Sequence, residues 1–325
     1  MTKAVLYSGT IHHNQAHEKL TMKRVVVFSE NSGWHEQALL ERLAARQVDV
    51  LVCSLRDCRI DFAAGVRGLV IPGFDQGLPD AAFVRAIPDG GFQQVAFRLD
   101  ILHGLAACGI PVYNPPTAIE YTVDKGMTTF LLLRSGIPTP PTRVCESRDD
   151  AGDLVARENA TGNRMVLKPL FGNCGRGLQL IDRPEQLPLP EDVDGIYYLQ
   201  RYIRQGDGSG RDWRVFVING LAVAAMERVS GHWITNRARG GRCLPAVLTD
   251  PLRAMAEQAA SVTGTCYAGV DIIMDEAGEY TVLEVNSIPA WRGLQSVCRK
   301  DIAELLVEDF LRHLSTGGET SATAV

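Results

Sequence analysis

The stretch VLKPLFGNCGRGLQLI, from Val166 to Ile181, places three glycines within six residues, shortly after a Lys-Pro pair. In a Walker P-loop the lysine follows the glycines and a helix begins at once. Here Lys168 comes first, and the apolar run after the glycines is too short for the helix of a Rossmann motif. We therefore predict a hairpin flap, with Met165–Lys168 and Leu178–Ile181 as paired strands and residues 171–177 as its tip.

Such a flap can bind phosphates through its backbone N–H groups, because glycine lets the main chain approach a ligand closely. Lys168 would then direct its ammonium group at the phosphates, with Arg176 in support. Glycine-rich hairpins without a ligand are also common, so both interpretations stay open on this motif alone. The lysine is informative, since 27 of the 33 basic residues are arginine and only six are lysine.

A second motif, YTVLEVNSIP at 280–289, alternates in polarity, so Glu284 and Asn286 project from one face of a buried strand. A buried carboxylate is costly unless a cation or a partner compensates it. Asp271 lies in another apolar strand, and the turn signal DEAG at 275–278 predicts that the two strands form an antiparallel hairpin. The three side chains can then face one pocket as hard oxygen ligands, which suit Mg²⁺. Structural hydrogen bonds by the two acids remain the alternative.

The segment between these motifs is rich in arginine. Residues 197–202 predict a strand that runs into a connection, which could form an adenine-binding hinge. Asp212 and Arg214 share one face of another strand, and Arg228 follows the strand at 221–226. Arginine suits phosphate and carboxylate groups, but the chain-wide excess of arginine weakens this signal.

The N-terminal part predicts a small doubly wound α/β domain over residues 21–115, because apolar strands alternate with helical patterns. We expect strands at 24–28, 48–54, 68–72 and 110–113, with helices at 36–46 and 93–107. Ligands of such sheets lie beyond the carboxyl ends of the strands, so Ser29–Gly33 and Pro72–Gln76 are candidate contacts. Residues 1–20, with His12, His13 and His17, and the tail 315–325 are expected to be flexible.

Composition limits the function classes. With 46% hydrophobic and 22% charged residues, the 325-residue chain is typical of a soluble globular protein of two or three lobes. A net charge of −5 predicts no nucleic-acid or anionic-membrane surface, and no apolar run approaches the ~20 residues that span a bilayer. Eight scattered cysteines without a CxxC pair, and the absence of a secretory signal pattern, predict a reduced cytoplasmic protein without a zinc site.

Taken together, the motifs resemble the ATP-grasp superfamily, specifically the RimK-type α-L-glutamate ligases, over residues 22 to about 314. The matching segments are Asp124-Lys125, Leu167-Lys168-Pro169, Gly172–Gly177, Gln200–Ile203, Asp212–Val217, Arg228, Asn236–Gly241, Gly269–Asp271 and Leu283–Ser287. The resemblance implies a fold of α/β and α+β class: a Rossmann-like pre-ATP-grasp domain (21–115), a small lobe with the glycine-rich flap (116–194) and a C-terminal lobe with the metal site (195–314).

The resemblance also implies roles for individual residues. ATP would be bound by Lys125, Lys168, Gly172, Gly175, Arg176, Gly177, Gln200, Arg201, Tyr202, Ile203, Asp212 and Arg214, with adenine at 200–203. Two Mg²⁺ ions would be held by Asp271, Glu284 and Asn286. Arg228 and Asn236, with Lys168, would face the γ-phosphate and an acyl intermediate.

The implied activity is an ADP-forming carboxylate–amine ligation through an acyl phosphate. The chain looks nearest to ligases that add L-glutamate to one-carbon carriers of the tetrahydromethanopterin or methanofuran type, so the partners would be a small acceptor carboxylate and L-glutamate. Relatives are often homo-oligomers.

The sequence departs from the family pattern at three places. Arg201 stands where relatives usually have an acid, and Asn173 replaces a serine of the flap. The loop 288–293 is bulkier than in relatives, so Trp291 and Arg292 are expected to border an altered acceptor pocket. Arg237 and Arg239, with Arg292, are the candidates for binding the carboxylates of glutamate.

Other activities remain open. A ligase of this type could join glutamate to a tyrosine- or tyramine-like furan precursor, or to a protein tail. A non-catalytic module that senses ATP is the alternative of another class, against which the intact Asp271, Glu284 and Asn286 set argues.

Overall fold

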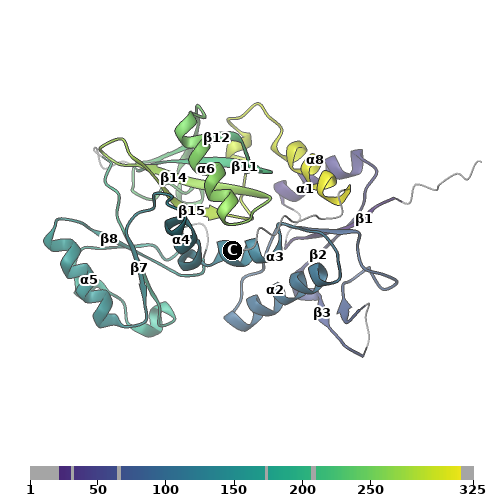
Figure 1. The fold of residues 1–325 in the computed structure, drawn as a ribbon, viewed down its shortest axis with the longest axis horizontal. Coiled ribbons are helices and arrows are strands. Elements are labelled where there is room, and N and C mark those ends of the chain that lie inside the picture. The colour runs from purple at the N-terminus through teal and green to yellow at the C-terminus, as the bar shows by residue number, and fades with distance from the viewer. Residues whose placement is uncertain (1–21, 31–32, 64–66, 173–174, 206–209, 316–325) are drawn as a thin grey trace, which may run out of the picture.

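The computed structural model describes residues 22–30, 33–63, 67–172, 175–205 and 210–315. Three main sheets carry the fold, and they follow one another along the chain (Figure 1). The N-terminal histidines, the C-terminal tail and Asn173 of the flap lie outside the described residues. Among the described residues, no helix has the length and apolar character needed to cross a membrane.

The first sheet is parallel and is covered on both faces. Its strands are β1 (Arg24–Phe28), β2 (Asp49–Cys53), β5 (Ala81–Val84) and β6 (Val112–Tyr113), in the order β2-β1-β5-β6. Alternate residues of β1 pack against α1 (Trp34–Ala45) on one face and α2 (Phe92–Ala107) on the other. Burial on both faces explains why β1 is a continuous apolar run.

One predicted strand was assigned to the wrong sheet. Leu69–Val70 forms β4, which pairs with β3 (Arg59–Ile60) in a separate two-stranded sheet. The third strand of the main sheet is instead β5, whose sequence AAFV is fully buried but contains two alanines, which are weak strand formers. The loop that follows a central strand at the carboxyl edge is therefore 85–90, and the expected contacts at Pro72–Gln76 are replaced by this loop.

The second sheet holds the predicted flap. After α3 (Pro116–Val123) and α4 (Lys125–Arg134) come β7 (Thr142–Cys145), α5 (Arg148–Ala160), β8 (Met165–Lys168), β9 (Gln179–Ile181) and β10 (Tyr197–Arg201), with the strand order β7-β10-β8-β9. The antiparallel pairing of β8 with β9 confirms the hairpin. Met165 and Leu167 pack under α5, so Val166 and Lys168 face the opposite side.

The third sheet is antiparallel and has five strands in the order β13-β12-β11-β14-β15. They are β11 (Gly210–Ile218), β12 (Leu221–Ser230), β13 (Arg242–Pro245), β14 (Tyr267–Met274) and β15 (Tyr280–Asn286). Helix α6 (Asp250–Val262) covers one face. The remaining elements are α7 (Arg292–Gln295), α8 (Ile302–Ser315) and the short 3-10 turns η1 (Leu55–Asp57), η2 (Pro184–Gln186), η3 (Pro190–Val193) and η4 (Arg237–Arg239).

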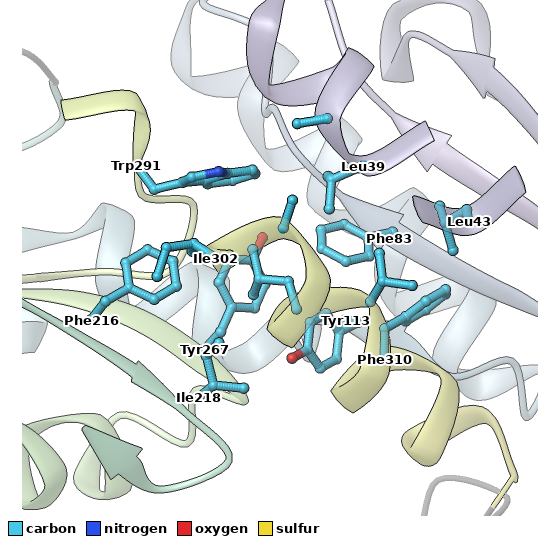
Figure 2. Close-up of a cluster of buried hydrophobic side chains, with 14 of the residues drawn as sticks. Leu39, Leu43, Phe83, Tyr113, Phe216, Ile218, Tyr267, Trp291, Ile302 and Phe310 are labelled. Atoms are coloured by element: carbon cyan, nitrogen blue, oxygen red, sulfur yellow. The ribbon is translucent and has the colours of Figure 1, made fainter. Parts of the chain in front are cut away.

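The C-terminal helix α8 returns to the first sheet and lies beside α1 (Figure 1). One hydrophobic cluster joins the two parts, with Phe83 and Tyr113 from the first sheet, Phe216 and Tyr267 from the third, and Phe310 from α8 (Figure 2). The rings of Tyr113 and Tyr267 stack with centroids 5.0 Å apart. The N-terminal domain and the five-stranded sheet therefore share one core.

Tyr113 also supplies a polar contact inside this core. Its hydroxyl donates a 2.7 Å hydrogen bond to the carboxylate of Asp309, which is 1% exposed. We expect Tyr113→Phe to lower the free energy of unfolding by about 1.5–3 kcal/mol, because Oδ2 of the buried carboxylate loses its hydroxyl donor, while Arg312 still donates to Oδ1. Chemical denaturation measures the change. The control is Tyr197→Phe, which removes a 2.9 Å bond to the neutral carbonyl of Pro188 and is expected to cost about 0.5–1.5 kcal/mol. Equal losses in both variants would contradict a charged role for Asp309.

Candidate active site

A cavity lies between the second and third sheets and brings together residues that are far apart in the sequence. Fifteen of the predicted site residues line it: Lys125, Lys168, Gly172, Gly175, Arg176, Gln200, Arg201, Tyr202, Ile203, Asp212, Arg228, Asn236, Asp271, Glu284 and Asn286. We call this the first cavity. It has the two-sided construction that the motifs predicted, with the flap and lysines on one side and the acids on the other.

The flap packs against the connection between β12 and β13, and two of its positions require glycine. Gly175 and Gly177 have φ angles of +68° and +72°. A Cβ atom at Gly175 would lie 2.7 Å from Oδ1 of Asn236, and one at Gly177 would lie 2.7 Å from Cγ of Pro169. Arg239 donates a 3.1 Å hydrogen bond to the carbonyl of Gly175. The glycines thus allow both the left-handed backbone and the close approach.

The two lysines lie under the flap and form no ion pair with a carboxylate within the described part of the chain. Nζ of Lys168 donates to Oε1 of Gln200 at 2.6 Å, and Nζ of Lys125 donates to the carbonyl of Gly172 at 2.9 Å. Burial lowers the pKa of both lysines, that of Lys168 to about 8, against the opposing attraction of Glu284. Polyphosphate oxygens would supply the negatively charged partners that these two ammonium groups do not have among the described residues.

A buried network of two arginines and two aspartates forms the floor. Arg228 donates to both oxygens of Asp212 at 2.6–2.7 Å and to Asp271 at 2.8 Å. Arg214 binds both oxygens of Asp271 at 2.7 Å. Thr235 adds a 2.6 Å bond to Asp212. Burial alone would raise the pKa of Asp271, but the two guanidinium groups hold it well below its usual range.

This network explains the separate positions of the two arginines. Arg228 lines the cavity, whereas Arg214 lies behind Asp271 and does not line it. Space for Arg214 comes from Gly269, where a Cβ atom would lie 3.4 Å from Cδ of Arg214 and 2.8 Å from Cβ of Pro289. Arg214 therefore orients the acid and has no surface on the cavity for a nucleotide contact.

The acids lie on the predicted hairpin. Asp271 pairs with Glu284 and Gly269 with Asn286, but the register shifts after Asp271, so that Leu283 is the extra residue of a bulge. Asn286 donates to Oε1 of Glu284 at 3.1 Å, which leaves the amide oxygen of Asn286 free to bind a cation. Both oxygens of Asp271 already accept from arginine. The oxygens of Glu284 and Asn286 fit Mg²⁺, which prefers hard oxygen ligands and is usually shared with substrate phosphates. The described residues hold no group of three His, Cys, Asp or Glu that could bind a metal.

Several predicted contacts lie elsewhere. Arg201 reaches the cavity wall, but its guanidinium is held by Glu158 in two bonds of 2.9 and 3.0 Å. Gly177 lines the neighbouring cavity. Arg237, Arg239 and Arg292 are exposed, and Trp291 is fully buried among the residues of the shared core (Figure 2); none of these four lines either cavity.

The sequence motifs missed the apolar walls of the first cavity, formed by Val166, Leu178, Ile273, Leu283 and Trp233. Val166 could have been predicted to face the cavity, because it alternates along β8 with Met165 and Leu167, whose side chains face α5. Leu283 was hidden by the bulge, because strict alternation places it on the face opposite Glu284.

A second cavity, of about 650 Å³, adjoins the first, within the range of roughly 300–1,000 Å³ typical of small-molecule sites. It lies between the loop 85–90, helix α3, the flap and the end of β15. The two cavities share Lys125, Gly172, Arg176, Glu284 and Asn286, among other residues. We call this boundary the shared wall, and it is where a group in one cavity can meet a group in the other.

The loop after β15 is tied to the first domain by His35 of α1. Its Nε2 accepts 3.1 Å hydrogen bonds from the backbone N–H groups of Trp291 and Arg292. Burial lowers the pKa of His35 to about 4, and the charges of Arg85, Arg292 and Arg237 act in the same direction. His35 is therefore neutral near pH 7 and holds the loop in place.

This contact predicts a pH dependence of stability. The pKa of His35 is depressed in the folded protein, so the unfolded chain binds more protons between pH 6.5 and 4. The contribution of His35 is complete above pH 6.5 and is lost as the pH falls. We expect the melting temperature of the wild type to fall more between pH 7.5 and 5 than that of His35→Gln. The exposed control His232→Gln is expected to follow the wild type, and parallel curves for all three proteins would contradict the assignment.

Comparisons with known proteins agree with this geometry. The sequence profile of the RimK-like ATP-grasp domain matches residues 122–310. The tetrahydromethanopterin:α-L-glutamate ligase of Methanococcus maripaludis is 30% identical over 302 residues, covering 89% of this chain and 98% of the relative. The enzyme of the same name from Methanocaldococcus jannaschii is 34% identical, covering 73% and 81%. The ATP-grasp ligase PsnB, solved with a precursor variant, Mg and ADP, shares the fold at a TM-score of 0.67 and 20% identity, covering 90% of this chain and 99% of that one.

Proposed function

This chain belongs to the RimK-like ATP-grasp family of ligases, and on that basis we propose that it joins the α-amino group of L-glutamate to a carboxylate of a one-carbon-carrier cofactor, of pterin or furan type, or of its precursor. ATP would be the energy source and ADP the product. The observation that carries the proposal is the shared wall, where Lys125 faces Glu284 and Asn286 between two adjoining cavities.

The first cavity suits ATP. Its apolar walls at Val166, Leu178 and Leu283 offer faces on which a planar base can stack, and strand β10 ends beside them at Arg201. Because Glu158 holds the Arg201 side chain, the backbone of 201–203 is left to recognise the base. The triphosphate would extend under the flap toward Lys168 and the shared wall.

Magnesium is expected at the acidic side of the same cavity. Glu284 and Asn286 offer free oxygens, and Asp271 can join them by exchanging one arginine contact. We propose two ions, as the resemblance to the family implies. Bound there, Mg²⁺ would offset the negative charge of the phosphates.

The reaction needs no nucleophile from the protein. A carboxylate oxygen of the acceptor attacks the γ-phosphorus, the bond to the β-phosphate oxygen breaks, and ADP leaves. Lys168 and Arg228 stabilise the negative charge on the transferring group. The amine then attacks the carbonyl carbon of the acyl phosphate, phosphate leaves with the C–O electron pair, and the amine loses a proton. The flap excludes water that would hydrolyse the intermediate.

The relatives support the choice of substrates. Two of them are named for glutamate transfer to tetrahydromethanopterin, and both cover most of the chain. The second cavity adjoins the phosphate-binding region, so it has the position required for the acceptor and the amine.

Two substitutions test the machinery. We expect Lys168→Ala and Glu284→Gln each to lower kcat for glutamate-dependent ADP release by about 10²–10³-fold, because the first removes a cation that stabilises the transferring phosphate and the second removes a charged ligand of the proposed magnesium site. A coupled assay for ADP with a mass measurement of the product checks this. Lys23→Ala, at the exposed Lys23–Asp80 pair, is the control and should match the wild type. Unchanged turnover in both site variants would refute the assignment.

The acceptor is identified by the same product-mass assay. Candidate acceptors are a tetrahydromethanopterin-type pterin, a furan amine with glutamate as the acid, and a peptide with a free C-terminal carboxylate. A mass gain of one glutamate on the pterin supports the proposal. ATP binding in calorimetry without ADP formation from any of these would instead indicate a nucleotide-sensing module.

A further inference from the structure

Arg85 lines the second cavity and has no role in the phosphate site. It follows β5, in the loop that replaced the expected contact region. Its guanidinium lies 4.5 Å from the ring centre of Trp291, and Nη1 is 3.5 Å from the hydroxyl of Tyr267. Nε is buried and has no hydrogen-bond partner in the part of the chain that the structure describes. No carboxylate within the described residues lies at ion-pair distance from this guanidinium.

Such a group is costly unless something compensates it. A half-buried guanidinium has lost part of its hydration, and an aromatic face replaces only a fraction of it. Among the described residues, the only acceptor that the N–H groups of Arg85 reach is the Tyr267 hydroxyl. A ligand with two acceptor oxygens in a plane, such as a carboxylate, has the geometry that a guanidinium binds best.

Two further arginines add positive charge at this end of the molecule. Arg237 and Arg292 act on His35 in the same direction as Arg85 does, and Cδ of Arg237 lies 3.3 Å from the place where a Cβ of Gly293 would be. Neither forms an ion pair within the described residues. Glu36, the acidic neighbour of His35, is not ion-paired with any of the three. Within the described residues none of the three arginines is therefore ion-paired, and the acids that line the second cavity are Asp89 and Glu284.

We propose that Arg85 binds a carboxylate of a substrate in the second cavity, at a distance from the reacting group, while Arg237 and Arg292 strengthen the attraction through their field. This carboxylate would be the second one of a substrate whose reacting group lies at the shared wall. The identity of that substrate rests on the proposed function. L-Glutamate has two carboxylates besides its reacting amine, and an acceptor with two carboxylates has the same chemistry.

The proposal explains the bulky loop at 288–293. Trp291 was expected to contact the acceptor, but it lies in the core with its ring against Arg85. It is a positioning residue: the indole fixes the plane of the guanidinium, and His35 fixes the indole by accepting the backbone N–H of Trp291. Trp291 and His35, which lie behind the cavity wall, then determine the specificity of the cavity by fixing the orientation of Arg85.

Arg85→Gln, Arg85→Lys and the control Arg299→Gln test the proposal. Arg299 is exposed and lies outside both cavities. For Arg85→Gln we expect the KM of L-glutamate or of the acceptor to rise at least tenfold, since a charge-assisted hydrogen bond to the substrate carboxylate is removed, while the KM of ATP changes less than twofold. Which of the two KM values rises identifies the source of the carboxylate. Arg85→Lys should recover part of the loss, and the control should match the wild type.

A binding measurement separates this inference from the proposed function. Glutarate, a dicarboxylate without an amine, is titrated into the wild type and Arg85→Gln in the presence of Mg²⁺ and a non-hydrolysable ATP analogue. Binding to the wild type that weakens at least tenfold in the variant supports the site even when no acceptor gives ADP. Unchanged KM values in Arg85→Gln overturn it, and so does the absence of Arg85-dependent glutarate binding in an enzyme without turnover.

Discussion

The paired charges of Asp212, Arg228, Asp271 and Arg214 are the constraint on which the site depends. Buried charges are tolerated only when each is matched, and here every carboxylate oxygen of the two aspartates accepts at least one hydrogen bond from arginine. The pairing crosses β12, β11 and β14, so it fixes the relative register of three neighbouring strands at their cavity end. Arg228 is thereby held in one orientation, so in the proposed reaction its position does not have to be created when phosphate charge develops.

The face of the third sheet that carries these charges also contributes to the core shared with the N-terminal domain. Along β11, Asp212 and Arg214 are followed on that face by Phe216 and Ile218, which belong to the core shared with the N-terminal domain. Along β14, Tyr267 of that core precedes Asp271. The charged network of the cavity floor and the hydrophobic core shared with the N-terminal domain therefore lie at the two ends of the same sheet face. Because β11 and β14 run without a break from the shared core to the acids, the position of the N-terminal domain is coupled to that of the acids. The loop 85–90 belongs to this domain and is coupled in the same way.

Much of this arrangement was predictable from local patterns. Alternation in 280–289 placed Glu284 and Asn286 on one face, the turn signal paired them with Asp271, and glycine spacing gave the hairpin between β8 and β9. What was missed depended on tertiary structure. β5 is too alanine-rich to be recognised, so Arg85 was not linked to the site; the bulge concealed Leu283. Trp291 was expected to border the acceptor pocket, but it is buried, because sequence does not show which side of a loop is covered.

The packing of α8 on α1 also affects the order in which the chain can fold. The apolar face formed by Val25, Leu39 and Phe83 is covered by Leu306 and Phe310, which follow more than 200 residues later in the chain. During translation this face stays exposed until α8 has left the ribosome, so the first domain cannot complete its core before then. Truncation of α8 would therefore expose an apolar surface formed by residues far earlier in the sequence.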